Sequence, residues 1–440
     1  MKPIHVGLIG LGTVGAGVFE VLQRNGAEIQ RRAGRALVVT HVARRDTAAA
    51  EKVVAGRAKV SADARAVIQD PQVDVVVELM GGYDLTRQLV LEAIEAGKHV
   101  VTANKALLAV HGTEIFEAAR RKGVMVLFEA AVAGGIPIIK TLREGLTANR
   151  IEWVAGIING TTNFILSEMR DKGLDFDTVL RQAQALGYAE ADPTFDIEGV
   201  DAAHKISIVS AIAFGVPVQF NKATMEGITQ LSATDIRYAE QLGYRIKLLG
   251  ITKRVAQGIE LRVHPCLVPA KRLIANVEGA MNAVMVKGDA VGDTLYYGKG
   301  AGGLPTASAV VADLVDVARA FDVDAEHRVP ALGYMPAAMG SEQVIPLDEI
   351  VTSYYLRLRV RDEAGVLARI TAILAQANIS IDAVMQRESD EISGASSDQT
   401  DLIILTHQTR EGTMNQALKD ISSLDSVMAP IIRIRKEELV

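Results

Sequence analysis

Residues 4–15, IHVGLIGLGTVG, decide the fold class of this 440-residue chain. The apolar run 4–9 predicts a buried strand, and Gly10, Gly12 and Gly15 follow it at the start of a predicted helix. Glycines at this spacing allow a tight turn and let a pyrophosphate approach the helix N-terminus. The alternative is a packing turn without a ligand, but the strand before it and the helix after it favour nucleotide binding.

The pattern continues outward from this turn through residues 1–138. Further apolar strands are expected at 37–42, 73–78, 99–102 and 124–129, with helices at 86–96 and 112–122. Valine-rich strands separated by helices predict a parallel, doubly wound sheet of the Rossmann type, an α/β fold. Ligands of such sheets bind beyond the carboxyl ends of the strands.

Two of these strand ends carry basic residues. The second strand ends in HVARRD (41–46), where Arg44 and Arg45 suit a ribose 2′-phosphate and therefore favour NADP over NAD. The two arginines could instead be a solvated loop pair, and Asp46 keeps NAD possible. Lys105 follows the strand 99–102, where it either contacts the cofactor or the reacting group or is merely solvated.

A second informative stretch is LGYAEADPTFDIEGVDAAHKISIV, residues 186–209. A helix from about residue 200 carries apolar side chains around most of its circumference, so we expect it to be largely buried. Asp201 and Lys205 are four residues apart and share one face. A buried lysine is costly unless it is paired or has a task, so this segment is a candidate active site.

The remaining chain divides into three further parts. Residues 139–305 mix helices with clustered strands, which predicts an α+β domain, and the periodic helix 306–321 is expected to pack back on the first domain. Residues 322–350 contain three prolines and little periodicity, so they are interpreted as a linker. Residues 351–440 follow the order βαββαβ, which predicts a ferredoxin-like domain.

The composition excludes several classes of protein. Hydrophobic residues make up 49% and the formal net charge is −6, which indicates a globular chain and argues against nucleic-acid or anionic membrane partners. Cys266 is the single cysteine, so an internal disulfide framework is excluded. With neither a signal-peptide pattern nor an apolar run of membrane-spanning length, we expect a cytoplasmic protein.

Several stretches together resemble the homoserine dehydrogenase family along nearly the whole chain. They are GLIGLGTVG (7–15), VTANKALLA (101–109), EAAVAGGIPII (129–139), GIINGTTNFIL (156–166), residues 186–208 and KGAGGLPTASAVVADL (299–314). The tail is similar to an ACT domain, a small amino-acid-sensing module. Its turn DEAGVL (362–367) has Ala364 where the usual pattern has proline before the glycine.

The resemblance implies a reaction and roles for particular residues. The reaction is the reversible NADP(H)-dependent reduction of L-aspartate 4-semialdehyde to L-homoserine, which leads to threonine, methionine and isoleucine. Lys205 is implied to be the proton donor and acceptor, with Asp201 orienting it and Lys105 near the nicotinamide. Glu190, Asp196 and Asp201 match substrate-binding acids, and the implied cofactor contacts include Thr13, Val14, Gly187 and Gly302 as well as the glycine turn and Arg44.

Two further sites come with the resemblance. Backbone carbonyls of Glu129, Val132, Gly134 and Ile136 match a sodium (or potassium) site, although the small residues there would equally suit a tight connection between domains. An amino-acid effector, L-threonine, is expected near Gly365 and Asn378, between paired tails of a homodimer or homotetramer.

Two rival functions fit parts of the same sequence. A semialdehyde dehydrogenase that forms an acyl intermediate would need a thiol nucleophile, for which only Cys266 is available. An NADPH- and amino-acid-binding regulatory protein without catalysis would not need Lys205 in a buried helix beside paired acids.

Overall fold

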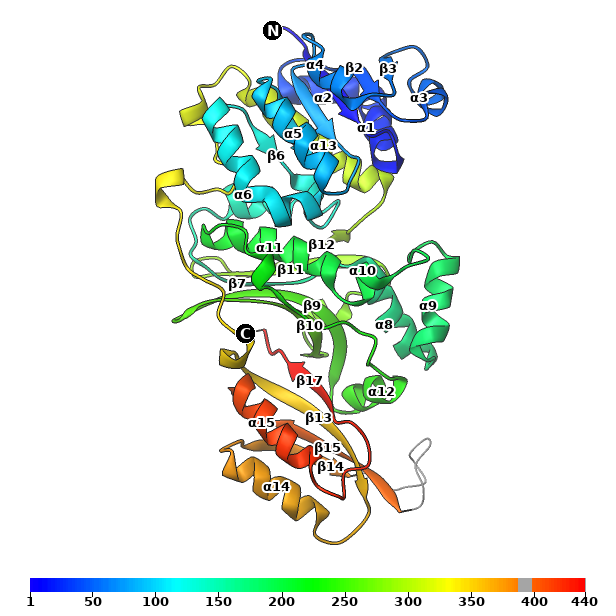
Figure 1. The fold of residues 1–440 in the computed structure, drawn as a ribbon, viewed down its shortest axis with the longest axis vertical. Helices are drawn as coiled ribbons and strands as arrows, with labels where there is room; N and C mark the ends of the chain where they lie inside the picture. The colour runs from blue at the N-terminus through cyan, green and yellow to red at the C-terminus, as the bar shows by residue number, and fades with distance from the viewer. Residues whose placement is uncertain (387–397, 440) are drawn as a thin grey trace.

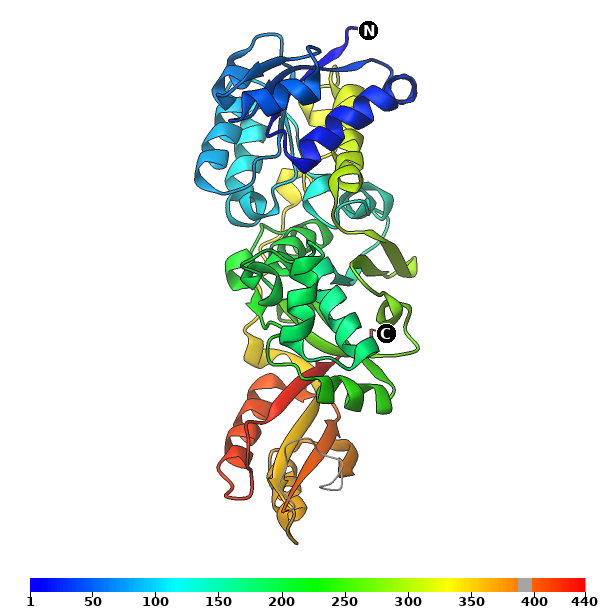
Figure 2. The same ribbon diagram turned by 90° about the vertical axis from the view of Figure 1, so that its right-hand side faces the viewer.

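The structure is a computed structural model that describes residues 1–386 and 398–439. Three parts follow one another along the long axis, with the N-terminal sheet at one end and the tail at the other (Figures 1 and 2). Helix α11 (Val200–Phe214) lies between the N-terminal part and the central sheet. In the described residues, no helix has the length and apolar character needed to cross a membrane.

The N-terminal part is a six-stranded parallel sheet in the order β3-β2-β1-β4-β5-β6. Its strands are β1 (Ile4–Ile9), β2 (Leu37–Ala43), β3 (Lys59–Ser61), β4 (Val75–Glu78), β5 (His99–Thr102) and β6 (Val126–Leu127), and its helices are α1 (Thr13–Arg24), α2 (Gly26–Ala33), α3 (Thr47–Val54), α4 (Ala64–Gln69), α5 (Asp84–Glu95) and α6 (Lys105–Lys122). This order is the doubly wound Rossmann arrangement, and its direction reverses between β1 and β4, where a dinucleotide binds. The predicted fold class of this part is confirmed.

Two elements, α6 and β6, differ most from their predicted bounds. Helix α6 begins at Lys105 rather than at residue 112, since Asn104 caps it by accepting a hydrogen bond from Leu107 N at 3.0 Å. Strand β6 has two residues rather than six, because the chain turns into a 3-10 helix, η1 (Glu129–Ala131). Glu129 N donates there to Asp313 Oδ2 on helix α13 (Gly303–Ala320), which packs against α1.

The second sheet has eleven strands and runs through both the central part and the tail. Its main order is β12-β11-β7-β9-β10-β17-β13-β15-β14. The strands are β7 (Ile151–Ile157), β9 (Tyr244–Val255), β10 (Gly258–Pro269), β11 (Met281–Gly288), β12 (Gly292–Lys299), β13 (Val351–Arg361), β14 (Ile381–Gln386), β15 (Gln399–Thr406) and β17 (Ile432–Lys436), with short β8 (Thr224–Met225) and β16 (Thr409–Arg410) beside them.

Helices cover this second sheet. In the central part they are α7 (Ile138–Lys140), α8 (Gly160–Lys172), α9 (Phe176–Ala185), α10 (Thr194–Ile197), α11 and α12 (Ala233–Gln241), and in the tail α14 (Val366–Gln376) and α15 (Glu411–Ser422). Every residue of α11 from Asp201 to Phe214 is buried, which confirms the expectation from its apolar circumference.

The tail is joined to the central part more closely than its sequence suggests. Strand β17 pairs in parallel with β10, with Cys266 opposite Arg435. The alternation of apolar and polar residues in β13 predicts a half-buried strand, and the arginines at 357, 359 and 361 are more exposed than the apolar residues between them. Tyr355 differs from this pattern, because it is fully buried like Tyr354. Helix α12 covers the second face, and Tyr355 Oη donates to Asp235 Oδ1 at 3.2 Å.

Candidate active site

The candidate site begins with the ion pair between Asp201 and Lys205 on α11. Lys205 Nζ lies 2.6 Å from Asp201 Oδ2 and donates a second hydrogen bond to the carbonyl of Ile158 at 2.7 Å. The predicted pair on one helix face is therefore present and buried. An ammonium has three N–H donors, and these two contacts use two of them.

Lys105 brings the N-terminal part to the same carboxylate. Its Nζ lies 3.3 Å from Asp201 Oδ1 and 5.7 Å from the ring centre of Phe195. Asn104 holds the start of α6 in place, because its Nδ2 also donates to the carbonyl of Gly82 at 2.8 Å. The structure thus brings together Lys105, Lys205 and Asp201 between the two sheets.

Asn159 connects the two acids of this site. Its Nδ2 lies 2.9 Å from Asp201 Oδ2 and 2.7 Å from Asp196 Oδ1, while its Oδ1 caps α8 by accepting from Thr162 N. Sequence reasoning missed Asn159, although an asparagine ahead of Gly-Thr-Thr is a helix N-cap signal. Its amide fixes the distance between two carboxylates that would otherwise repel each other.

The charges of these acids differ because their neighbours differ. Burial alone would raise the pKa of Asp201, but Lys205 and Lys105 outweigh it and hold that pKa at about 2. Burial, and then the negative charge of Asp201, raises the pKa of Asp196. Asp201 is therefore the firmly ionised partner of the two lysines.

His204 forms an aromatic wall beside Lys205. It is buried, and its ring centre lies 4.2 Å from that of Phe220, 5.4 Å from Phe195 and 6.4 Å from Tyr83. Burial lowers the pKa of His204 to about 4, so the ring is neutral at neutral pH. Sequence reasoning did not single out this residue, because a histidine on an apolar helix is usually part of the core.

Three other acids of this segment lie elsewhere. Asp192 accepts from Thr194 N at 3.1 Å, and Glu198 accepts from Thr229 Oγ1 at 3.2 Å, so both shape the loop. Glu190 is exposed, and in the described part of the chain no hydrogen bond or ion pair joins its carboxylate to Asp201. Gly187 is an exposed turn residue with φ +78°.

The glycine turn combines two tightly packed positions with one open position. A Cβ on Gly10 would lie 2.7 Å from the backbone of Leu79, and one on Gly15 would lie 2.3 Å from the Gly10 carbonyl. A Cβ on Gly12 would meet no atom of the described residues within 4 Å, although Gly12 caps α1. The open space at the helix N-terminus is what a pyrophosphate needs, so the residues fit a dinucleotide.

The other predicted cofactor residues surround this turn. Thr13 and Val14 begin α1, and Gly303, next to Gly302, packs against Thr13. Arg44 donates to the carbonyl of Leu11 at 2.7 Å, which places its guanidinium beside the turn.

Glu78 shapes the neighbouring loop and was missed from the sequence. It is fully buried at the end of β4 and accepts from Thr102 Oγ1 and Met80 N, each at 2.7 Å, and from Gly81 N at 3.1 Å. Burial raises the pKa of Glu78. Its contacts predict a role in shaping the loop that follows β4.

Comparison with known proteins decides the family. Residues 137–315 match the homoserine dehydrogenase family, residues 10–129 match the homoserine dehydrogenase NAD binding domain, and residues 354–423 match the ACT domain. The homoserine dehydrogenase of Pseudomonas aeruginosa is 57% identical over 439 residues, and that of Neisseria gonorrhoeae is 55% identical over 439 residues, each covering 100% of both chains.

The chain belongs to the homoserine dehydrogenase family. It is accordingly an NAD(P)-dependent oxidoreductase. The crystal structure of a homoserine dehydrogenase from Thiobacillus denitrificans is 61% identical, with a TM-score of 0.95 and coverage of 100% of this chain and 99% of that one. The predicted combination of a Rossmann-type domain, a catalytic domain and an ACT domain is thereby confirmed.

The segment where the family resemblance suggests a cation is a tight connection in this homoserine dehydrogenase family member. The Glu129 carboxylate accepts from Ile139 N at 2.9 Å and Lys140 N at 2.8 Å, so its side chain caps α7. Gly134 takes a φ of +52°, and a Cβ there would lie 2.3 Å from the carbonyl of Gly300. Val132 and Ile136 are buried on either side.

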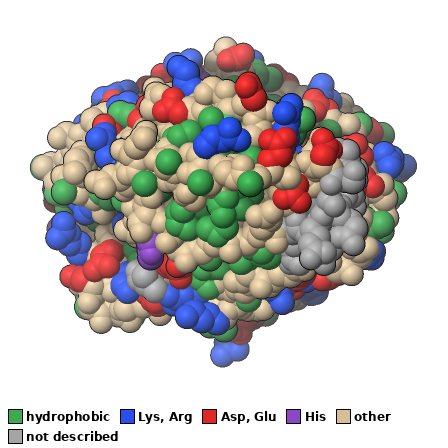
Figure 3. All heavy atoms as spheres, turned by 90° about the horizontal axis from the view of Figure 1, so that it is seen from below, with side chains coloured by type: hydrophobic (Ala, Val, Ile, Leu, Met, Phe, Trp, Pro, Cys, Tyr) green, Lys and Arg blue, Asp and Glu red, His purple; other side chains and the backbone are tan. Residues whose placement is uncertain are grey.

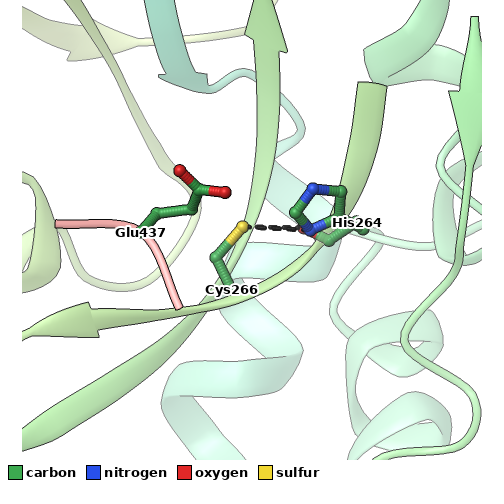
Figure 4. A group of neighbouring side chains, drawn as sticks. All are labelled: His264, Cys266 and Glu437. Atoms are coloured by element: carbon green, nitrogen blue, oxygen red, sulfur yellow. Dashed lines mark hydrogen bonds between the residues drawn. The ribbon is translucent and has the colours of Figure 1, made fainter. Parts of the chain in front are cut away.

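The single cysteine lies in a buried cluster away from α11. His264, Cys266 and Glu437 offer ligand atoms within 4.8 Å of one another, and Cys266 Sγ lies 3.2 Å from His264 Nδ1 (Figure 4). The Arg262 guanidinium contacts Glu437 and lies 2.7 Å from His264 Nε2, so a cation is already present. Burial raises the pKa of the Cys266 thiol, which does not suit a nucleophile.

The two predicted effector residues lie at opposite ends of α14. Gly365 caps the start of the helix, and Asn378, with φ +61°, follows its end, about 20 Å away at 1.5 Å per residue. A cavity of about 320 Å³ includes Gly365 together with Asp362, Gln386 and Thr400. One small ligand can therefore contact both Gly365 and Asn378 only if two tails contribute.

Proposed function

We propose that this chain reversibly reduces L-aspartate 4-semialdehyde to L-homoserine with NADP(H), in the pathway branch to threonine, methionine and isoleucine. The observation that carries the proposal is the convergence of Lys105 and Lys205 on Asp201, between a dinucleotide-type sheet and a buried helix. Such a site has a cofactor side and a proton-handling side, as reversible reduction of an aldehyde requires.

Lys205 is proposed to move the proton. When bound, the nicotinamide supplies or accepts the hydride. Beyond the two donors held by Asp201 and Ile158, Lys205 keeps one N–H that has no partner among the described residues. This donor can protonate the substrate oxygen as negative charge develops on it. Asp201 holds the ammonium in position, and Lys105 adds positive charge at the same point.

The acids are proposed to bind the substrate ammonium. Asp196 lies 2.7 Å from Asn159, which also contacts Asp201, so the two carboxyl groups are held near each other. Glu190 and Gly187 lie on the exposed loop before α10 and are proposed to contact substrate and cofactor, respectively.

The dinucleotide is proposed to be NADP. Gly10, Gly12 and Gly15 would hold its pyrophosphate at the start of α1, with Thr13, Val14 and Gly302 beside it. Arg44 lies against the turn, whereas the acid that could select NAD, Asp46, accepts from Ala49 N at 2.9 Å and caps α3. A carboxylate committed to a helix cap is less available to a ribose hydroxyl, which favours the 2′-phosphate.

A sodium or potassium ion is proposed at the carbonyls of Glu129, Val132, Gly134 and Ile136. The side chain of Glu129 is used as a helix cap, so its contribution would be its main-chain oxygen. The close approach of Gly134 to Gly300 places a further carbonyl at this point. The ion would stiffen the connection between the two sheets and take no part in the chemistry.

The tail is proposed to bind an amino-acid effector, L-threonine, across two copies of the chain in a homodimer or homotetramer. Gly365 and Asn378 would then come from different copies. Hydrophobic side chains gather near the centre of the face seen at the tail end of the molecule (Figure 3), and Leu367 and Val384 of the tail are more than a third exposed. Edge strand β12 also exposes Tyr297.

Nicotinamide absorbance tests the proposal directly. The purified chain is mixed with L-homoserine and NADP, and the assay is repeated with NAD and with L-threonine added. We expect absorbance to rise with homoserine, faster with NADP, and to be suppressed by threonine. Binding of NADPH and amino acid without any absorbance change would favour the non-catalytic regulatory alternative.

A further inference from the structure

Two arginines of the tail, Arg433 and Arg435, form ion pairs with Glu226 of the central part. Arg433 and Arg435 are two residues apart on β17, so they face the same side of the sheet. Arg433 lies 3.1 Å and Arg435 2.7 Å from Glu226 Oε1, and Arg435 also contacts Glu411 of α15. Arg435 is 2% exposed, so its buried positive charge needs these carboxylates as counter-charges.

Glu226 sits where two short ladders meet along one edge of β10. Strand β8 pairs there with Arg262 and Val263, and β17 pairs with Cys266 and Leu267. Glu226 directly follows β8, and its N–H donates to the carbonyl of Val263 at 2.8 Å. The side chain therefore faces the tail, while the backbone belongs to the catalytic sheet.

The residues after Glu226 pack directly behind the turn that carries the site acids. Ile228 N donates to the carbonyl of Ile197 at 2.9 Å, and Thr229 Oγ1 donates to Glu198 Oε1 at 3.2 Å. A Cβ on Gly227 would lie 2.5 Å from the carbonyl oxygen of Ile197, so the backbones of the two segments are in contact.

Ile197 and Glu198 lie between the two acids that Asn159 joins, Asp196 and Asp201. A shift of the segment 226–229 therefore displaces the residues that join Asp196 to Asp201. A continuous series of contacts thus joins β17, through Glu226 and the segment 226–229, to the substrate side of the site.

We infer that Arg433 and Arg435 position the catalytic turn 193–199 through Glu226, which makes Glu226 a positioning residue for the substrate acids. The inference rests on the proposed function only in taking Asp196 and Asp201 as the substrate side. If the inference holds, the tail influences the position of the substrate acids through its ion pairs with Glu226.

A second ion pair between the tail and the central part supplies a matched control. Arg357 Nε of β13 lies 2.6 Å from Asp235 Oδ1 of α12, and Asp235 is fully buried. Among the described residues, its side-chain hydrogen bonds are with Ser232, Tyr355 and Arg357, and none is with the turn 193–199. Loss of this pair loosens the tail without touching the segment 226–229.

The experiment compares Glu226→Gln with Asp235→Asn in the full chain. Amide hydrogen exchange is followed in peptides covering 193–203 and 232–241, together with kcat and the KM values for homoserine and NADP. We expect Glu226→Gln to speed exchange in 193–203 and to raise the homoserine KM about 3- to 30-fold, with the KM for NADP little changed. Asp235→Asn should speed exchange in 232–241 only.

Unchanged exchange in 193–203, or the same change in both variants, overturns the inference. Faster exchange there with an unaltered homoserine KM supports the positioning and instead contradicts the proposed substrate role of the acids. Hydrogen exchange can be measured without turnover. A chain that fails to oxidise homoserine therefore contradicts the proposed function but leaves the inference about Glu226 testable by exchange. Thr229→Val, combined with Glu226→Gln, should give a less than additive rise in KM if both act through the turn.

Discussion

Lys105 Nζ lies 3.3 Å from Asp201 Oδ1, and this ion pair links the first residue of α6 to the first turn of α11. The other oxygen of the same carboxylate lies 2.6 Å from Lys205. One carboxylate thus forms ion pairs with two ammonium groups from two parts of the molecule. Both ion pairs exist only when the nucleotide-binding part and α11 are held together.

Removing the carboxylate should therefore change how stability depends on pH. The pKa of Asp201 is about 2, below its ordinary value of 3.8, so ionised Asp201 favours the folded state. This contribution is present above pH 4 and is lost as the pH falls toward 2. It is worth about 2 kcal/mol at neutral pH, at about 1.4 kcal/mol per pKa unit.

The measurement is the free energy of urea unfolding for the original chain and Asp201→Asn at pH 7, 5, 4 and 3. The difference between the two should be largest at pH 7 and 5 and should shrink below pH 4. A difference that stays constant down to pH 3 would contradict the depressed pKa.

Two alanine substitutions in the glycine turn should have opposite consequences. Gly12→Ala adds a methyl group at a point where no described atom lies within 4 Å. The melting temperature should therefore stay within about 2 °C while the KM for NADP rises about tenfold or more. Gly15→Ala places its methyl group 2.3 Å from the Gly10 carbonyl and should destabilise the fold by about 1–3 kcal/mol. Calorimetry and cofactor kinetics separate the two, and equal loss of stability in both variants would count against an open phosphate site.

The sequence predicted the parts of this site that depend on local spacing. The glycine turn needs three positions six residues apart or less, and the Asp201–Lys205 pair needs only one helical turn. Asn159 could not be found in this way, because it reaches Asp201 across 42 positions of sequence. The start of α6 was predictable in principle, since Asn104 is a capping residue. The apolar residues of this helix recur with only weak periodicity, so the sequence pattern placed its start too late.

The tail shows a second limit of sequence patterns. Alternation in β13 identifies its two faces, and one of them forms the tail's own core with α14 and α15. Nothing in that alternation says that α12, more than a hundred residues earlier, covers Tyr355 and Arg357. Polar and aromatic residues that look solvent-facing can be paired across domains, and only the tertiary structure shows the partner.

Replacing the strand-end arginines should shift cofactor preference. Arg44→Ala is expected to raise the KM for NADP about tenfold, because a charge-assisted contact to phosphate is lost, and to leave the KM for NAD nearly unchanged. Arg45→Ala, which alters an exposed neighbour, shows whether the second arginine contributes. The ratio of kcat/KM for NADP and NAD is the quantity to compare, and an unchanged ratio in both variants means that another group selects the cofactor.

The strongest expectation concerns Lys205 itself. Lys205→Met keeps much of the side-chain volume in a buried position but removes the proton donor, so kcat should fall by about 10²–10⁴-fold. NADPH binding, followed by fluorescence titration, should stay within about twofold of the original chain, because no glycine-turn contact is altered.

A buried lysine elsewhere separates loss of chemistry from loss of packing. Lys247 on β9 is 1% exposed and donates to the carbonyl of Val277 at 2.6 Å, and burial lowers its pKa to about 8. Lys247→Met should lower the melting temperature while the folded fraction keeps its kcat. Since the two variants delete the same charged group from buried positions, similar losses of turnover in both would show that Lys205 acts through structure rather than as the proton donor.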